Sequence, residues 1–188
     1  METGWFIDPY RARQRVWITA GELDRIETEY PWKVRLQQLL EKYLGYTCVK
    51  FCEMFGENID LTDYSGESTY LSTDIEQSLL HLHEYLGFEF PNPGSVVNYL
   101  RQNPGIYDAV LYACMLAEEA FGQRAQITLD VYSDPEIEDE YLTIYIRQHT
   151  YDTDIMEQID VICGEYEAAL GDQPGWIVVT TDFRPPTE

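Results

Sequence analysis

The sequence predicts an α+β fold in which a helical N-terminal half packs on a small C-terminal sheet. Apolar residues recur every three or four positions over most of residues 1–122, which is the spacing of amphipathic helices. After residue 125, two segments alternate between apolar and polar residues, as half-buried strands do. The length of 188 residues suits one domain, 1–188, with a mainly helical portion, 1–122, and a β-β-α-β portion, 123–184.

Helices are expected where an apolar stripe lies between a start signal and a stop signal. Capping boxes, in which a threonine is followed three residues later by glutamate, mark two starts, at Thr19 and Thr73. Glycine or an Asn-Pro pair follows the far end of most stripes. The helices expected in the first portion are one starting near residue 19 and those over residues 32–44, 73–86, 95–102 and 106–121.

The second portion is expected to hold three strands and one helix. Residues 126–132 and 141–147 alternate, and the acidic segment 133–140 between them is interpreted as a long hairpin loop. A helix with an apolar stripe follows, from about residue 153 to 170. Residues 176–183 are expected to form a third strand that is partly apolar on both sides, which predicts a position at the centre of the sheet. Residues 184–188 are expected to be loose.

Acidic residues outnumber basic ones strongly and unevenly. The net charge is −22, yet residues 1–50 carry 8 basic and 7 acidic side chains, whereas residues 51–188 carry 4 and 27. This balance excludes direct, unaided binding to nucleic acid, because phosphate backbones require clustered Lys and Arg. It favours a basic protein as partner, and it predicts that added salt raises the melting temperature by screening repulsion.

The sequence predicts a cytoplasmic protein without a membrane segment. The first residues lack the charged and apolar regions of a secretory signal, and no apolar run is long enough to cross a bilayer. The four cysteines lie in apolar surroundings and are expected to be reduced and buried: Cys48, Cys52, Cys114 and Cys163. The oligomeric state stays open, and a homo-oligomer is one of the alternatives.

The acidic hairpin is the densest group of chemically distinctive residues. A solvated turn is the plainest interpretation, a surface for a basic partner is the second, and a divalent-metal site is the third. On the second strand, Tyr141, Tyr145 and Arg147 are expected to share a face beside the acids. That face is either an interface, where tyrosine is enriched, or ordinary core covered by the N-terminal helices. The candidate partner-binding residues are therefore Asp134, Glu136, Glu138, Asp139, Glu140, Tyr141 and Tyr145.

Other patterns carry weaker indications of chemistry. Cys48-x₃-Cys52 and His81-x-His83 invite a zinc interpretation, but histidines two apart on a helix do not face each other. No glycine-rich phosphate loop and no nucleophile elbow occurs in the sequence. Asp182 could be a catalytic carboxylate at a strand end, although a turn former is the commoner role. We therefore predict no metal and no cofactor.

Two function classes follow from these patterns. The favoured hypothesis is a non-enzymatic binding protein of the inhibitor, antitoxin or adaptor type, whose acidic face engages a basic partner. The alternative is a metal-dependent hydrolase that uses clustered carboxylates. Acids spread over an exposed surface favour binding, whereas acids that converge in a pocket beside a histidine favour catalysis.

Overall fold

The computed structural model describes residues 30–44, 72–134 and 139–187. The chain divides into two compact units, Met1–Ser78 and Leu79–Glu188. In the first unit the structure describes α2 (Pro31–Leu44) and the start of α4 (Ser72–Leu86). Both confirm helices expected from the apolar stripes, and the buried residues of α2 are Leu36, Leu39 and Leu40. The helix expected near residue 19 lies outside the described residues.

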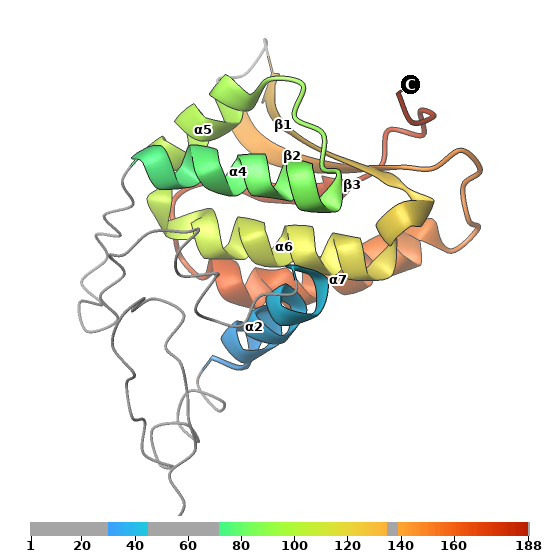
Figure 1. The fold of residues 1–188 in the computed structure, drawn as a ribbon, viewed down its shortest axis with the longest axis horizontal. Coiled ribbons are helices and arrows are strands. Elements are labelled where there is room, and N and C mark those ends of the chain that lie inside the picture. Colours follow the sequence, from blue (N-terminus) through green and yellow to red (C-terminus); the bar gives the residue numbers. More distant parts are fainter. Residues whose placement is uncertain (1–29, 45–71, 135–138, 188) are drawn as a thin grey trace, which may run out of the picture. The chain divides into compact units, whose positions relative to one another are not determined.

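The second unit contains the end of α4 and all later helices (Figure 1). Helix α4 ends before Gly87, whose φ of 71° is a conformation that glycine adopts without strain. Helix α5 (Pro93–Gln102) starts at Asn92, whose Oδ1 accepts a hydrogen bond from the Ser95 N–H. Helices α6 (Tyr107–Ala120) and α7 (Ile155–Leu170) then run side by side. Each lies within a few residues of its predicted range.

The sheet of the second unit has the strand order β1-β2-β3. Strands β1 (Gln126–Asp134) and β2 (Asp139–Arg147) are antiparallel, and β3 (Ile177–Thr180) lies parallel to β2. Helix α7 connects β2 to β3, so the predicted β-β-α-β order is confirmed. Together with the preceding helices, this sheet gives the predicted α+β class.

The prediction that the third strand is central was wrong, because β3 lies at the edge of the sheet. Its apolar pattern has another cause. Helix α7 covers the outer edge of β3, where the Tyr166 hydroxyl donates a hydrogen bond of 3.1 Å to the Ile177 carbonyl. Edge strands need such cover to avoid pairing with other chains. Burial also raises the pKa of Tyr166, which keeps its donor proton in place.

The hairpin is tighter than predicted. Strands β1 and β2 extend to Asp134 and Asp139, so ladder pairing replaces half of the predicted long loop, and residues 135–138 between them lie outside the described residues.

One face of the sheet is apolar and nearly all of it is buried in the core. We call it the apolar face, and its members are Ile127, Leu129, Val131, Leu142, Ile144, Ile146, Ile177 and Val179.

In the described part of the chain, no helix combines the length and apolar character needed to span a membrane.

Candidate functional site: the tyrosine face of the sheet

The face of the sheet opposite the apolar face is polar and aromatic. Residues directly opposite each other on paired strands point to the same side, so the register assigns its members. We call it the tyrosine face, and its two central threonines, Thr128 and Thr143, are buried. On β1 and β2 it consists of the pairs Gln126–Arg147, Thr128–Tyr145, Asp130–Thr143 and Tyr132–Tyr141.

The hairpin end of the tyrosine face exposes aromatic rings beside acids. The rings of Tyr132 and Tyr141 stack with their centroids 5.0 Å apart and their planes 29° from parallel. Tyr132 is 39 % exposed, and Tyr141 is half-buried. Asp139 follows on the same face of β2, and its side chain is exposed. This end therefore offers an aromatic surface next to a carboxylate.

The structure brings together only part of the predicted partner-binding set. Asp134 lies opposite Asp139 in the register. Tyr145 also belongs to the tyrosine face, but Thr143 separates it from Tyr141 on that face. Exposed Glu140 is opposite Ser133, and by alternation it belongs to the other side of the sheet. Glu136 and Glu138 lie outside the described residues. The acids of the hairpin are therefore divided between both sides of the ribbon.

The end of the tyrosine face farthest from the hairpin already holds a cation. The guanidinium carbon of Arg147 lies 5.4 Å from the ring centroid of Tyr145, within cation–π range. Arg147 also donates from Nε and Nη2 to Asp182, with a shortest distance of 2.8 Å. These hydrogen bonds lower the pKa of Asp182 and raise the pKa of Arg147. The Asp182 carboxylate is therefore ionised and engaged in an ion pair.

The segment that follows β3 crosses the far end of the tyrosine face. The Tyr151 hydroxyl donates to the Arg184 carbonyl at 2.6 Å. The Gln126 side chain donates to the Thr187 carbonyl at 3.2 Å and accepts the Thr187 N–H at 2.9 Å. We call residues 181–187 with these contacts the clasp. The prediction of a loose segment was wrong, because side chains of β1 and the β2–α7 loop hold its backbone.

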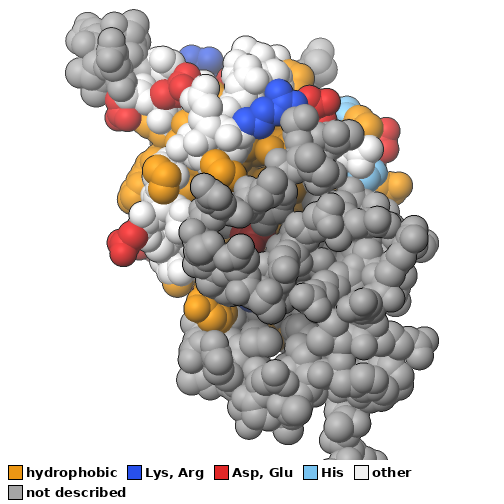
Figure 2. Space-filling view, turned by 90° about the vertical axis from the view of Figure 1, so that its left-hand side faces the viewer, with side chains coloured by type: hydrophobic (Ala, Val, Ile, Leu, Met, Phe, Trp, Pro, Cys, Tyr) orange, Lys and Arg blue, Asp and Glu red, His pale blue; other side chains and the backbone are white. Residues whose placement is uncertain are grey.

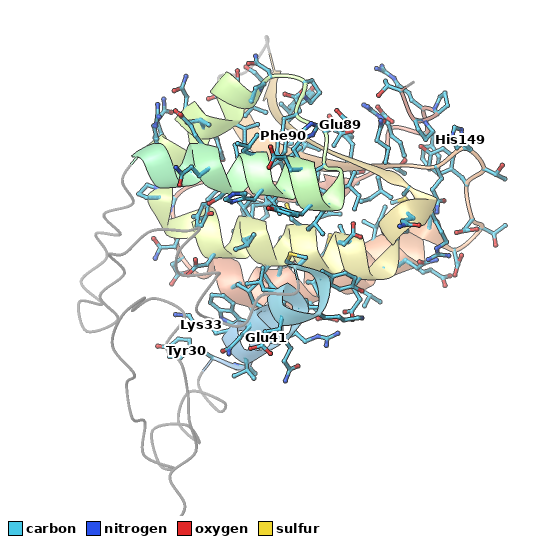
Figure 3. All side chains as sticks on the ribbon, viewed as in Figure 1. Tyr30, Lys33, Glu41, Glu89, Phe90 and His149 are labelled. Carbon is cyan, nitrogen blue, oxygen red and sulfur yellow. The ribbon has the colours of Figure 1, made fainter. Side chains whose placement is uncertain are left out.

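The charges are arranged unequally between the two ends of the sheet. Of the four basic residues after position 50, three lie at the clasp end: Arg124 precedes β1, Arg147 ends β2 and Arg184 follows β3. Asp152 and Asp182 face them, with Arg124–Asp152 at 3.8 Å and Arg184–Asp182 at 3.7 Å. Figure 3 shows His149 in the neighbouring β2–α7 loop. The clasp end is therefore nearly neutral, whereas the hairpin end is acidic.

On the side of the molecule shown in Figure 2, acidic side chains are scattered among hydrophobic ones on the described residues. On this side, the acids of the described residues are thus spread apart and not gathered in one place. A partner attracted by charge alone would therefore have no preference for the hairpin over other acidic positions. The exposed tyrosine stack is the feature that distinguishes that end.

The other candidates from the sequence have ordinary roles or lie outside the description. His83 Nδ1 lies 2.7 Å from the Phe88 carbonyl, to which it donates when protonated there. Cys48 and Cys52 lie outside the described residues. Within the described ranges, no group of three or more His, Cys, Asp or Glu side chains is placed to hold a metal ion. Asp182 takes the turn-forming role, because its Oδ1 also accepts the Arg184 N–H.

Sequence reasoning missed Gln126 and Tyr151, which anchor the clasp. Neither belongs to a motif, and their partners are 61 and 33 residues away along the chain. One signal was available for Gln126. It continues the alternation of the first strand, and this places it on the same face as the tyrosines. For Tyr151 we find no signal in the sequence.

No match was found for this chain among family models, curated proteins or solved structures.

Proposed function

We propose that this protein is a non-enzymatic binding module that engages a basic protein through the hairpin end of the tyrosine face. The observation that supports it best is the exposed Tyr132–Tyr141 stack beside the Asp139 carboxylate. Tyrosine combines a large apolar surface with a polar tip, and it is enriched among the residues that dominate binding energy. Arginine and lysine side chains are the natural complement of such a surface.

The contact between Tyr145 and Arg147 supports a partner that presents arginine. An arginine of the chain itself lies over one of its tyrosine rings. A partner's arginine over the exposed Tyr132 ring would repeat this geometry, and each such contact contributes about 0.5–1 kcal/mol at an exposed site. Long-range attraction by the net charge of −22 would add mainly to the association rate.

The test is an affinity capture from a lysate of the source cell. Three versions of the full chain serve as bait, and the captured material is washed at low and then at high salt. The wild type is compared with a hairpin variant, Asp139→Asn with Tyr141→Ala. A matched control carries Glu157→Gln, which removes the same number of charges, one, from an exposed position of α7. The captured protein is then purified and titrated against each version.

The proposal expects a basic protein that is retained by the wild type and by the α7 control. The hairpin variant should bind it at least about tenfold more weakly, because truncation of an interface tyrosine costs about 2 kcal/mol or more at a central position. Equal weakening of both variants would mean that net charge alone explains the binding, and it would refute a site at the hairpin. Retention by all three versions would refute it as well.

A further inference from the structure

In the clasp, side chains bind backbone groups of Arg184 and Thr187, and proline favours an extended conformation in the residue before it. Tyr151 donates to the carbonyl of Arg184, and Gln126 binds both the N–H and the carbonyl of Thr187. The Thr187 hydroxyl adds a third contact, at 3.1 Å from Gln126 Oε1. Between these two anchor points lie Pro185 and Pro186, which have no N–H to donate. The segment therefore cannot join the sheet as a strand, and side chains must bind it instead.

This combination matches a known mode of peptide recognition. Proline-rich segments form a preformed extended helix whose carbonyls stay free, and aromatic surfaces with hydroxyl donors bind it at low entropic cost. In the clasp the donor is a tyrosine hydroxyl, and the carbonyl it binds directly precedes a proline. Pro185 is exposed and Pro186 is half-buried, so backbone hydrogen bonds provide most of the specificity.

A strained turn leads the segment into these contacts. Phe183 has a φ of 54°, which is unfavourable for a residue with a side chain. It is also 62 % exposed, and its ring lies 5.2 Å from that of Tyr151. Strain of this kind persists only where surrounding contacts hold it. Here the holding contacts are the Asp182 ion pair before it and the two anchors after it.

We propose that the clasp end of the tyrosine face is a binding site for extended, proline-containing segments that carry arginine, and that residues 184–187 of this chain occupy it in the structure. A segment of similar chemistry from another protein would bind by displacing them. The site stands apart from the proposed function, because it uses Gln126 and Tyr151 rather than the hairpin. The charge of the site also suits an arginine, since the Asp182 carboxylate already forms an ion pair with the Arg184 side chain.

The test separates the site from its resident segment while keeping the full chain. In a four-glycine variant, Arg184, Pro185, Pro186 and Thr187 are each replaced by glycine, which keeps the backbone groups but removes the prolines that restrict them, so that the resident segment competes only weakly. The probe is a fluorescent synthetic peptide, Phe-Arg-Pro-Pro-Thr-Glu, which has the sequence of residues 183–188. Binding is measured by fluorescence anisotropy, and circular dichroism confirms that each variant is folded.

The peptide should bind the four-glycine variant with a Kd on the order of 0.1–1 mM, since only a few hydrogen bonds hold it. Its binding to the wild type should be weaker by a factor of about two to ten, because the resident segment competes at an effective concentration of about 1 mM. Adding Gln126→Ala or Tyr151→Phe to the variant should weaken binding at least about threefold. A matched control, Tyr85→Phe on the exposed side of α4, should leave binding unchanged.

A peptide with both prolines replaced by alanine should also bind more weakly, since it loses the preformed backbone. No binding to a folded four-glycine variant would overturn the proposal and leave residues 181–187 as a structural clasp only. Binding that is equal for the wild type and the variant, or that ignores Gln126 and Tyr151, would overturn it too. In either of those cases the peptide would be bound somewhere else.

Discussion

The ion pair between Arg147 and Asp182 connects the end of β2 to the clasp, and removing it is the most informative test of the structure. The substitution is Asp182→Asn, which keeps the side-chain size and the oxygen that accepts the Arg184 N–H. It removes the charge that Arg147 faces. The side chains of Arg147 and Asp182 are only 13 % and 18 % exposed, so solvent screens their attraction weakly.

The expected loss lies between two limits. Fully exposed pairs contribute about 0–1 kcal/mol, whereas removal of one partner from a buried pair costs about 3–5 kcal/mol. The bidentate geometry and the small exposure place this pair between them, and we expect the free energy of unfolding at pH 7 to fall by about 2 kcal/mol. Urea unfolding of the wild type and the variant measures this difference directly.

The pH dependence has a definite sign. The pKa of Asp182 is lower in the folded state, so its contribution is fully present above the pKa of the unfolded chain, about 4. It is lost as the pH falls through the lowered folded-state pKa, where wild-type Asp182 becomes neutral like asparagine. The difference between the two proteins should therefore shrink on acidification. A difference below about 0.5 kcal/mol at pH 7, or one that is independent of pH, would refute the reasoning.

Three further outcomes follow from burial and charge. Tyr166→Phe should lower the free energy of unfolding by about 1–2 kcal/mol in urea titrations, because the Ile177 carbonyl loses its donor; an unchanged midpoint would contradict this. Burial raises the pKa of the Cys114 thiol to about 12, so iodoacetamide at pH 8 should label half-buried Cys163 first and Cys114 only after unfolding, as read by mass spectrometry. Raising the salt concentration to about 0.3 M should raise the melting temperature, and a flat or falling value would refute net repulsion.

Local patterns predicted the elements well because each pattern needs only neighbouring residues. A helix requires an apolar stripe and a stop such as Gly87, and a strand pair requires two alternating segments. The edge position of β3 was not predictable in this way. Residues of β3 are apolar because both α7 and the rest of the sheet bury this strand. Sequence alone does not distinguish these two sources of burial.

The candidate site divides along the same line. Alternation along the second strand correctly placed Tyr141, Tyr145 and Arg147 on one face. The clasp was missed because it depends on contacts between residues far apart in sequence, and a proline pair at the end of a strand is equally typical of a loose segment. The role of Asp182 also required the structure, since a carboxylate at a strand end serves turns, ion pairs and catalysis alike.

The two proposed sites share one face and can still be tested independently. Tyr132 at the hairpin end and Gln126 at the clasp end are six positions apart on β1, which corresponds to about 20 Å at the rise of a strand. Substitutions that far apart, with no shared partner, have nearly additive effects. The ends also differ in charge, because Asp182 and Asp152 offset the arginines at the clasp, whereas no cation among the described residues is paired with Asp139 at the hairpin. A basic protein should therefore sense substitutions at the hairpin, and the proline-containing peptide should sense those at Gln126 and Tyr151. If either ligand responded to both sets, the two ends would not act as independent sites, and both proposals would have to be revised.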